Sequence, residues 1–273
     1  MTQLNEMTEM SDLLVTLVQT DLYWEDKRSN LEMLERKIVS ISEKTHLIVL
    51  PEMFSTGFSM NPSVLAEYMD GQTVDWMRRM AMRKKCILTG SVIIEEAGLY
   101  YNRLIWMLPN GQFGFYDKRH CFSLAGEHLH YTRGSKRLIA SVNGWRLNLN
   151  ICYDLRFPVW SRQGQDPGES NPEYDVLVYV ANWPDRRVAA WNALLPARAI
   201  ENQCYVIGVN RVGRDGHGIE HSGSSQVVDP LGEVRYQIRD AEGVETVKLE
   251  RSFLEDIRTR MPFWKDADSF EIG

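Results

Sequence analysis

The sequence is poor in cysteine and has no long apolar run. Its four cysteines form no Cys-x-x-Cys pair and lie far apart, at Cys86, Cys121, Cys152 and Cys204. No stretch reaches the roughly 18 uninterrupted apolar residues that a membrane-spanning helix requires. The first eleven residues include two glutamates and lack the apolar core of a signal peptide. We therefore expect a cytoplasmic protein with reduced thiols and no membrane partner.

Basic residues are fewer than acidic ones. The chain has 31 Lys and Arg against 37 Asp and Glu, which gives a formal net charge of −6 at pH 7. An acidic protein has no general affinity for a phosphate backbone, so we expect no nucleic-acid partner. The Walker-type GxxxxGK[ST], the dinucleotide GxGxxG and the Gly-x-Ser-x-Gly elbow are all missing. The sequence predicts no cofactor.

Apolar residues make up 44% of the chain and follow strand and helix patterns. Strands predicted at 13–19, 46–50 and 86–94 alternate with amphipathic helices at 31–41 and 74–84, which indicates crossover connections. Two antiparallel hairpins are predicted later, at 99–116 and 137–151. Further strands are predicted at 175–181, 204–210, 224–228, 233–238 and 244–249, and two more helices at 188–202 and 252–260. Mixed sheets with helices outside them favour a layered α/β sandwich.

No internal repeat and no shift in composition marks a second domain. The one linker-like stretch, residues 162–172, is short. We therefore expect an N-terminal tail at 1–12 and a single domain at 13–273, with a C-terminal tail from about residue 261. Trp264 and Phe270 in that tail could cover a partner subunit or dock on their own chain.

Three predicted strands end in side chains that can do chemistry. Glu52, Lys118 and Cys152 each follow such a strand, and α/β proteins build sites at the carboxyl ends of strands. A partly desolvated glutamate suits a general base, a lysine can hold a developing oxyanion, and a thiol is a nucleophile. Each residue also has a plain alternative: a solvated loop acid, a surface hairpin lysine and an inert core thiol.

The motifs around these residues, in this order, resemble the nitrilase (carbon–nitrogen hydrolase) superfamily. They are Leu-Pro-Glu-Met-Phe around Glu52, Tyr-Asp-Lys-Arg-His around Lys118 and Cys-Tyr-Asp-Leu-Arg-Phe-Pro from Cys152. The likeness spans nearly the whole chain and includes Ala-Asn-Trp-Pro at 181–184 and Ala-Arg-Ala-Ile-Glu-Asn-Gln at 197–203. Within the superfamily the chain is most similar to bacterial ω-amidases, through Glu-Met-Phe, Glu-His-Leu-His-Tyr and Tyr-Val-Ala-Asn-Trp-Pro.

The resemblance implies an α-β-β-α sandwich, a four-layer two-sheet core flanked by helices, that commonly dimerises sheet against sheet. It also implies a Glu-Lys-Cys triad of Glu52, Lys118 and Cys152, with Glu127 as a second acid. In that scheme Cys152 forms a thioester with the substrate, while Lys118 and the backbone N–H of Tyr153 hold the oxyanion. We therefore expect a small-molecule amide and water as substrates, and a homodimer.

The ω-amidase likeness implies that the substrates are 2-oxoglutaramate and related 2-oxo amides. Arg156 would bind the distal carboxylate, because a guanidinium can hold a carboxylate through two parallel hydrogen bonds. Phe54, Phe58 and Trp183 would shape the wall of a small pocket. The alternative for Arg156 is a structural ion pair with a neighbouring acid.

Rival functions remain open from the sequence. Another branch of the superfamily, an N-carbamoyl amine hydrolase or an aliphatic amidase, would use the same triad, whereas a true nitrilase usually has Cys-Trp-Glu where this chain has Cys-Tyr-Asp. From a different class, the chain could be a catalytically silent scaffold that binds another protein through an exposed sheet face.

Two further patterns are interpreted as structural. Four residues with metal-binding side chains lie within eleven positions, at His120, Cys121, His128 and His130. Their spacing does not fit a structural zinc motif, so we interpret them as loop residues that line the pocket and predict no metal. The glycine-rich stretch 213–223 is interpreted as a mobile loop.

Overall fold

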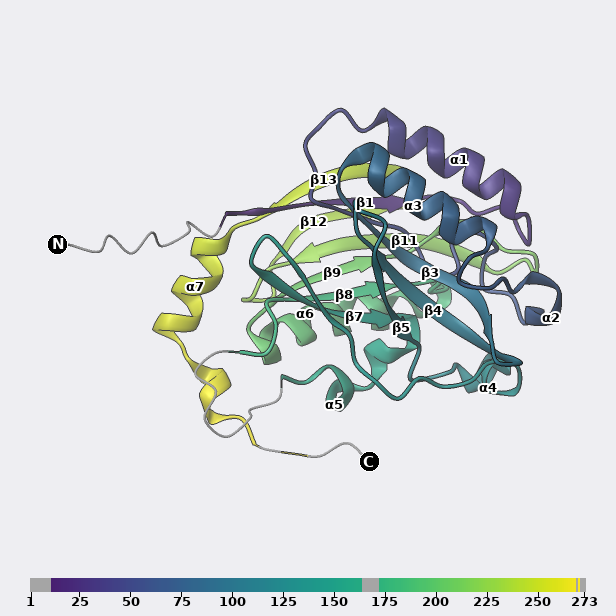
Figure 1. The fold of residues 1–273 in the computed structure, drawn as a ribbon. Helices are drawn as coiled ribbons and strands as arrows, with labels where there is room; N and C mark the ends of the chain where they lie inside the picture. Colours follow the sequence, from purple (N-terminus) through teal and green to yellow (C-terminus); the bar gives the residue numbers. More distant parts are fainter. Residues whose placement is uncertain (1–10, 164–171, 269, 271–273) are drawn as a thin grey trace.

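Two mixed β-sheets pack face to face in the computed structural model, which describes residues 11–163, 172–268 and 270 (Figure 1). The first sheet has the order β13-β1-β2-β3-β4-β5, and the second has the order β10-β11-β9-β8-β7-β6 with β12 paired to β11. The strands of the first sheet are β1 (Leu13–Gln19), β2 (Leu47–Val49), β3 (Ile87–Glu96), β4 (Leu99–Met107), β5 (Phe113–Asp117) and β13 (Gly243–Leu249). Those of the second are β6 (Ile139–Val142), β7 (Trp145–Ile151), β8 (Val176–Val180), β9 (Tyr205–Val209), β10 (Val212–Arg214), β11 (Glu220–Val228) and β12 (Val234–Arg239).

Helices cover the outer sides of both sheets. The α-helices are α1 (Lys27–Ser40), α2 (Pro62–Leu65), α3 (Gln72–Lys84), α4 (Glu127–His130), α5 (Pro158–Ser161), α6 (Val188–Asn202) and α7 (Arg251–Arg260). Short 3-10 turns are η1 (Ser123–Ala125), η2 (Cys152–Arg156), η3 (Asp185–Arg187) and η4 (Phe263–Asp266). In Figure 1, α1 and α3 lie over the first sheet, and α6 lies on the far side of the second. Among the described helices, none is long and apolar enough to cross a bilayer.

Alternation along the strands builds the apolar layers between these elements. In β8, Val176 and Val178 join the cluster between the two sheets, whereas Leu177 and Tyr179 join the cluster under α6. A strand with apolar residues at every position is the pattern of a strand covered on both faces. A third apolar cluster joins the first sheet to α1 and α3. The predicted four-layer α-β-β-α sandwich is confirmed, and one chain supplies all four layers.

Strand direction brings the predicted site residues to one edge. β1, β2 and β3 are parallel, and β5 runs with them because both β3 and β5 are antiparallel to β4. In the second sheet β7, β8 and β9 are parallel. The two edges meet, since the backbone N–H of Asn182 after β8 donates to Glu52 Oε2 after β2 at 2.9 Å. The segments that follow β2, β5, β7 and β8 therefore converge.

The glycine-rich stretch 213–223 differs from its prediction. The sequence predicts a mobile loop there, and this prediction is wrong, because β10 and the start of β11 form an antiparallel hairpin from Val212↔Ser222 to Arg214↔Glu220. Asp215 Oδ1 accepts from the backbone N–H groups of His217 and Ile219, both at 2.9 Å, and so closes the turn. Gly218 has φ +74, which a turn of this tightness needs.

The two ends of the chain are held by the same fold. β1 pairs with β13 along its full length, from Leu13↔Leu249 to Gln19↔Gly243. Past α7, the backbone N–H of Trp264 in η4 donates to Gln203 Oε1 at 3.0 Å, so this part of the C-terminal tail docks on its own chain. The division into tails at 1–12 and from about 261 around a single domain at 13–273 stays a prediction, which the shared core supports; residues 1–10 lie outside the described part.

Gly208 of β9 marks a close approach between the second sheet and α6. A Cβ atom at this position would lie 2.6 Å from Leu195 Cδ1 and 2.7 Å from Trp191 Cζ2. We expect Gly208→Ala to lower the free energy of unfolding by about 1–3 kcal/mol, because the added methyl overpacks this contact. Denaturant unfolding measures the change. Gly114→Ala is the control, since its Cβ would lie 3.6 Å from Leu138 Cδ2, an ordinary contact. Equal losses at the two positions would contradict the packing argument.

Candidate active site

A lysine and two glutamates form a buried charged cluster at the converging strand ends. Lys118 is the first residue after β5, and its Nζ donates to Glu52 Oε1 at 2.8 Å and to both carboxylate oxygens of Glu127 at 2.9 Å. The lysine side chain is 1% exposed and both glutamate side chains are fully buried. Buried charges are tolerated when they are paired and hydrogen-bonded, which this geometry achieves.

Two asparagines complete the hydrogen bonding of the carboxylates. Asn102 in β4 donates from Nδ2 to Glu52 Oε1 at 2.8 Å and to Glu127 Oε1 at 3.3 Å. Asn182 donates its backbone N–H to Glu52 Oε2 and its side-chain amide to the Glu52 carbonyl at 2.5 Å. Neither residue is among the site residues predicted from the sequence. Asn182 follows β8 as the predicted site residues follow their strands, and Asn102 is a buried polar residue next to Arg103 in β4.

The cluster sets the protonation of its members. Burial alone would lower the pKa of Lys118, but Glu127 and Glu52 raise it well above its usual value, so the lysine stays cationic. Burial raises the pKa of Glu127, against the opposing effect of Lys118. Burial, the charge of Glu52 and a hydrogen bond to Glu52 raise the pKa of the Cys152 thiol well above its usual value, although Lys118 opposes them. Cys152 is therefore a neutral thiol at rest and needs a base to become a nucleophile.

Cys152 lies in a strained turn directly after β7. Its φ of +45° is uncommon for a residue with a side chain, and such strain persists when the surroundings fix it. Asp154, two residues on, is fully buried, and its Oδ2 accepts from the backbone N–H of Ile151 at 2.9 Å. The Asp154 carboxylate therefore ties the turn back to the end of its strand.

Asp154 is in turn held by β5 of the other sheet and by the segment that follows β5. Tyr116 of β5 donates its hydroxyl to Asp154 Oδ2 at 2.8 Å, and the backbone N–H of His120 donates to Asp154 Oδ1 at 3.0 Å. Trp160 Nε1 donates to the Tyr116 hydroxyl at 2.9 Å. The support that Asp154 gives to the turn could not be predicted from local sequence, because Tyr116 and His120 lie 38 and 34 residues away in the chain.

A cavity of about 330 Å³ opens at Cys152, a size that suits a small ligand. Its wall includes the predicted residues Phe58, Lys118, Cys152, Tyr153, Arg156 and Trp183. The Arg156 guanidinium lies 4.9 Å from the centre of the Trp183 ring, and Lys118 Nζ lies 5.1 Å from the centre of the Phe58 ring. Within the described residues Arg156 forms no salt bridge, so the structural ion pair that was its alternative is not found there.

The prediction for Phe54 is wrong. Its side chain is fully buried in the cluster between the first sheet and helices α1 and α3, and it does not line the cavity. The ring packs against Gly90, where a Cβ would lie 2.8 Å from Phe54 Cδ1, and against Trp76 at 5.8 Å between ring centres. The chain turns sharply after β2, so Phe54 and Glu52 point into different layers.

The four residues with metal-binding side chains do not line the cavity, which corrects their interpretation. β5 ends at Asp117, so His120 and Cys121 are not on a strand. His120 Nδ1 lies 2.8 Å from Asp154 Oδ1, Cys121 is buried, and His128 and His130 are exposed on α4. In the part of the chain that is described, no group of three His, Cys, Asp or Glu could hold a metal ion.

Comparison with known proteins gives concordant matches. The family model described as carbon-nitrogen hydrolase matches residues 14–259. Omega-amidase YafV of Escherichia coli (strain K12) is 43% identical over 265 residues, which cover 96% of this chain and 100% of that one. The 2-oxoglutaramate amidase of Bacillus subtilis (strain 168) is 31% identical and covers 92% of this chain and 96% of its own. The crystal structure of a CN-hydrolase superfamily protein from Xanthomonas campestris, with an arsenic adduct in the active site, has a TM-score of 0.94 at 42% identity and covers 97% and 100% of the two chains.

Asn102→Asp tests the charge balance of the buried cluster. The substitution places a third carboxyl beside Glu52 and Glu127, and burial with like charges raises its pKa above the unfolded value of about 3.9. The variant should lose stability as the pH rises above that value, and we expect a loss of about 3 kcal/mol at pH 7 and less at pH 5. Thermal unfolding across this range measures it. Asn102→Ala, which adds no charge, is the control and should depend less on pH. The same loss for Asn102→Asp at pH 5 and pH 7 would refute the prediction.

Proposed function

The chain belongs to the carbon–nitrogen hydrolase family, and from this premise we propose that it is a thiol-dependent amidase for small 2-oxo dicarboxylic acid monoamides. It hydrolyses the ω-amide of 2-oxoglutaramate or 2-oxosuccinamate to the acid and ammonia. The observation that carries the proposal is the Cys152 thiol in the wall of a small cavity that is also lined by Lys118, whose ammonium donates to Glu52 and Glu127. The names of the relatives, omega-amidase and 2-oxoglutaramate amidase, support the choice of substrate.

The first half of the reaction forms a thioester. Because the Cys152 thiol is neutral at rest, Glu52 takes its proton as Sγ attacks the amide carbonyl carbon. The Lys118 ammonium and the backbone N–H of Tyr153 stabilise the oxyanion of the tetrahedral intermediate. When the intermediate collapses, the carbon–nitrogen bond breaks, and Glu52 gives its proton to the departing ammonia.

The second half releases the acid. Glu52 takes a proton from a water molecule that attacks the thioester, the carbon–sulfur bond breaks, and the proton returns to Cys152. Glu127 binds Lys118 through both carboxylate oxygens and so fixes the ammonium where the oxyanion forms. Arg156 binds the distal carboxylate of the substrate, and Phe58 and Trp183 enclose its short carbon chain.

A coupled ammonia assay tests the proposed activity. We expect the purified protein to release ammonia from 2-oxoglutaramate and 2-oxosuccinamate faster than from glutamine, and no carbon dioxide from a carbamoyl amino acid. Cys152→Ala should lose activity by about 10⁴-fold or more with its unfolding temperature retained, because the nucleophile is missing. Cys86→Ala removes a buried thiol from another layer and is the matched control. Carbon dioxide release from the carbamoyl compound would favour an N-carbamoyl amine hydrolase instead, and activity in Cys152→Ala would exclude the mechanism.

The protein is further proposed to be a cytoplasmic homodimer. Ile200 on α6 and Leu231 after β11 are 56% and 46% exposed, and Ile200 packs beside Gly232, so apolar surface gathers there. The described cysteines are free thiols, as a reducing compartment requires. The outer faces of the central strands are covered by helices, which supports helix α6 as the proposed dimer contact in place of a bare sheet face.

Light scattering on the cytoplasmic fraction tests this assignment. The active enzyme should elute as a species whose mass is twice the 31.6 kDa of one chain. Ile200→Glu should shift the protein to the mass of a single chain, because it places a charge in the apolar contact. Val64→Glu on α2, where Val64 is 73% exposed, is the control and should leave the dimer intact. A wild-type mass of one chain, or activity in another cell fraction, would contradict the assignment.

A further inference from the structure

The cavity wall carries more positive charge than the proposed chemistry uses. Lys118, Arg156, Arg186 and Arg187 line it, and Asp215 is the acidic side chain among its described lining residues. Lys118 is neutralised by its two glutamates, whereas the three arginines remain. A wall of this kind attracts anions and repels cations in the part of the cavity that does not react.

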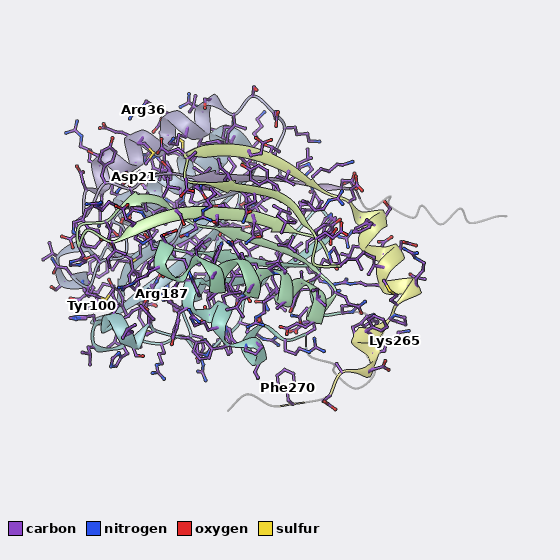
Figure 2. The ribbon with its side chains drawn as sticks, turned by 180° about the vertical axis from the view of Figure 1, so that it is seen from behind. Asp21, Arg36, Tyr100, Arg187, Lys265 and Phe270 are labelled. Atoms are coloured by element: carbon purple, nitrogen blue, oxygen red, sulfur yellow. The ribbon has the colours of Figure 1, made fainter. Side chains whose placement is uncertain are left out.

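Among these arginines, Arg187 has the most defined position. It ends η3 directly before α6, and Figure 2 shows it on the side of the molecule away from Lys265. Its carbonyl accepts from Trp183 Nε1 at 2.8 Å, which fixes the backbone beside another lining residue. Its guanidinium lies 5.0 Å from the centre of the Phe122 ring and forms no salt bridge with the described residues. Arg186, in contrast, is exposed.

The surroundings of Arg187 lack the negative charge that a guanidinium favours. Burial and then the neighbouring Arg186 lower the pKa of Arg187, and Arg156 acts in the same direction. His221 also lines the cavity, but burial and Arg211 lower its pKa to about 4, so it is neutral near pH 7. Both arginines line the cavity, so an anionic ligand bound there would offset the repulsion between their guanidinium groups.

We infer that Arg187 makes the site select amides of 2-oxo acids over amides of amino acids of the same length. The inference rests on the proposed function and deepens it. Beyond the reacting amide, 2-oxoglutaramate presents a carboxylate and an adjacent oxo group, and both groups accept hydrogen bonds. Glutamine presents the same carboxylate with an ammonium in place of the oxo group. The donors of Arg187, beside those of Arg156, match the first arrangement and repel the second.

The experiment compares specificity constants for 2-oxoglutaramate, glutamine and the neutral amide butyramide. In Arg187→Gln, which removes the charge and keeps a polar side chain, the ratio of kcat/KM for 2-oxoglutaramate over glutamine should fall by about tenfold or more. The change should come mainly from KM for 2-oxoglutaramate, and butyramide hydrolysis should stay within about twofold. Arg187→Lys should restore most of the ratio, because it restores the charge. Arg28→Gln is the matched control, because Arg28 on α1 is exposed and does not line the cavity, and it should leave the ratio within about twofold.

The outcomes separate this inference from the proposed function. A wild-type enzyme that prefers 2-oxoglutaramate, with an Arg187→Gln variant that keeps the same ratio, would overturn the role of Arg187 alone. An Arg187→Gln variant that loses butyramide hydrolysis to the same extent would also overturn it, because the side chain would then support the site as a whole. A wild-type protein that releases ammonia from none of the three amides would overturn the proposed function itself.

Discussion

The site depends on one buried lysine shared by two carboxylates. Lys118 donates three hydrogen bonds to Glu52 and Glu127, and without that cation the two acids would face each other in a dry interior. The arrangement requires β2 and β5 of the first sheet to end at one edge, which follows from the antiparallel strand β4 between β3 and β5. It also requires the second sheet to close over that edge, because Asn182 supplies the donor for the other oxygen of Glu52. The charged cluster can therefore form only when both sheets of the layered fold are in place.

The cluster and the cavity wall divide the electrostatics of the site into two regions. Around Lys118 the opposite charges are paired through short contacts, and the Cys152 thiol stays neutral among them. Across the cavity, Arg156 and Arg187 have no carboxylate partner among the described residues. A substrate with a neutral amide at one end and negative charge at the other fits both regions, and this polarity would orient it before any bond changes.

The sequence predicted the features that depend on local pattern. Strand and helix periodicity gave the elements of the sandwich, and the positions after β2, β5 and β7 identified Glu52, Lys118 and Cys152. Features that depend on distant partners could not be found in this way. Asp154 supports the turn through Tyr116, 38 residues away in the chain, and Asn102 joins Glu52 from 50 residues away. Phe54 was misplaced because the packing space above Gly90 exists only once β3 lies beside β2.

The pairing of β1 with β13 bears on how the chain is completed during synthesis. Thr16 and Thr246 meet side chain to side chain at 2.8 Å across this ladder, 230 positions apart in sequence. On the ribosome, β1 finds β2 early, but its other edge has no partner until residue 249 has left the exit tunnel. The first sheet therefore carries an open, β-branched edge for most of translation, and a chain truncated before β13 would retain that edge as a site for aggregation.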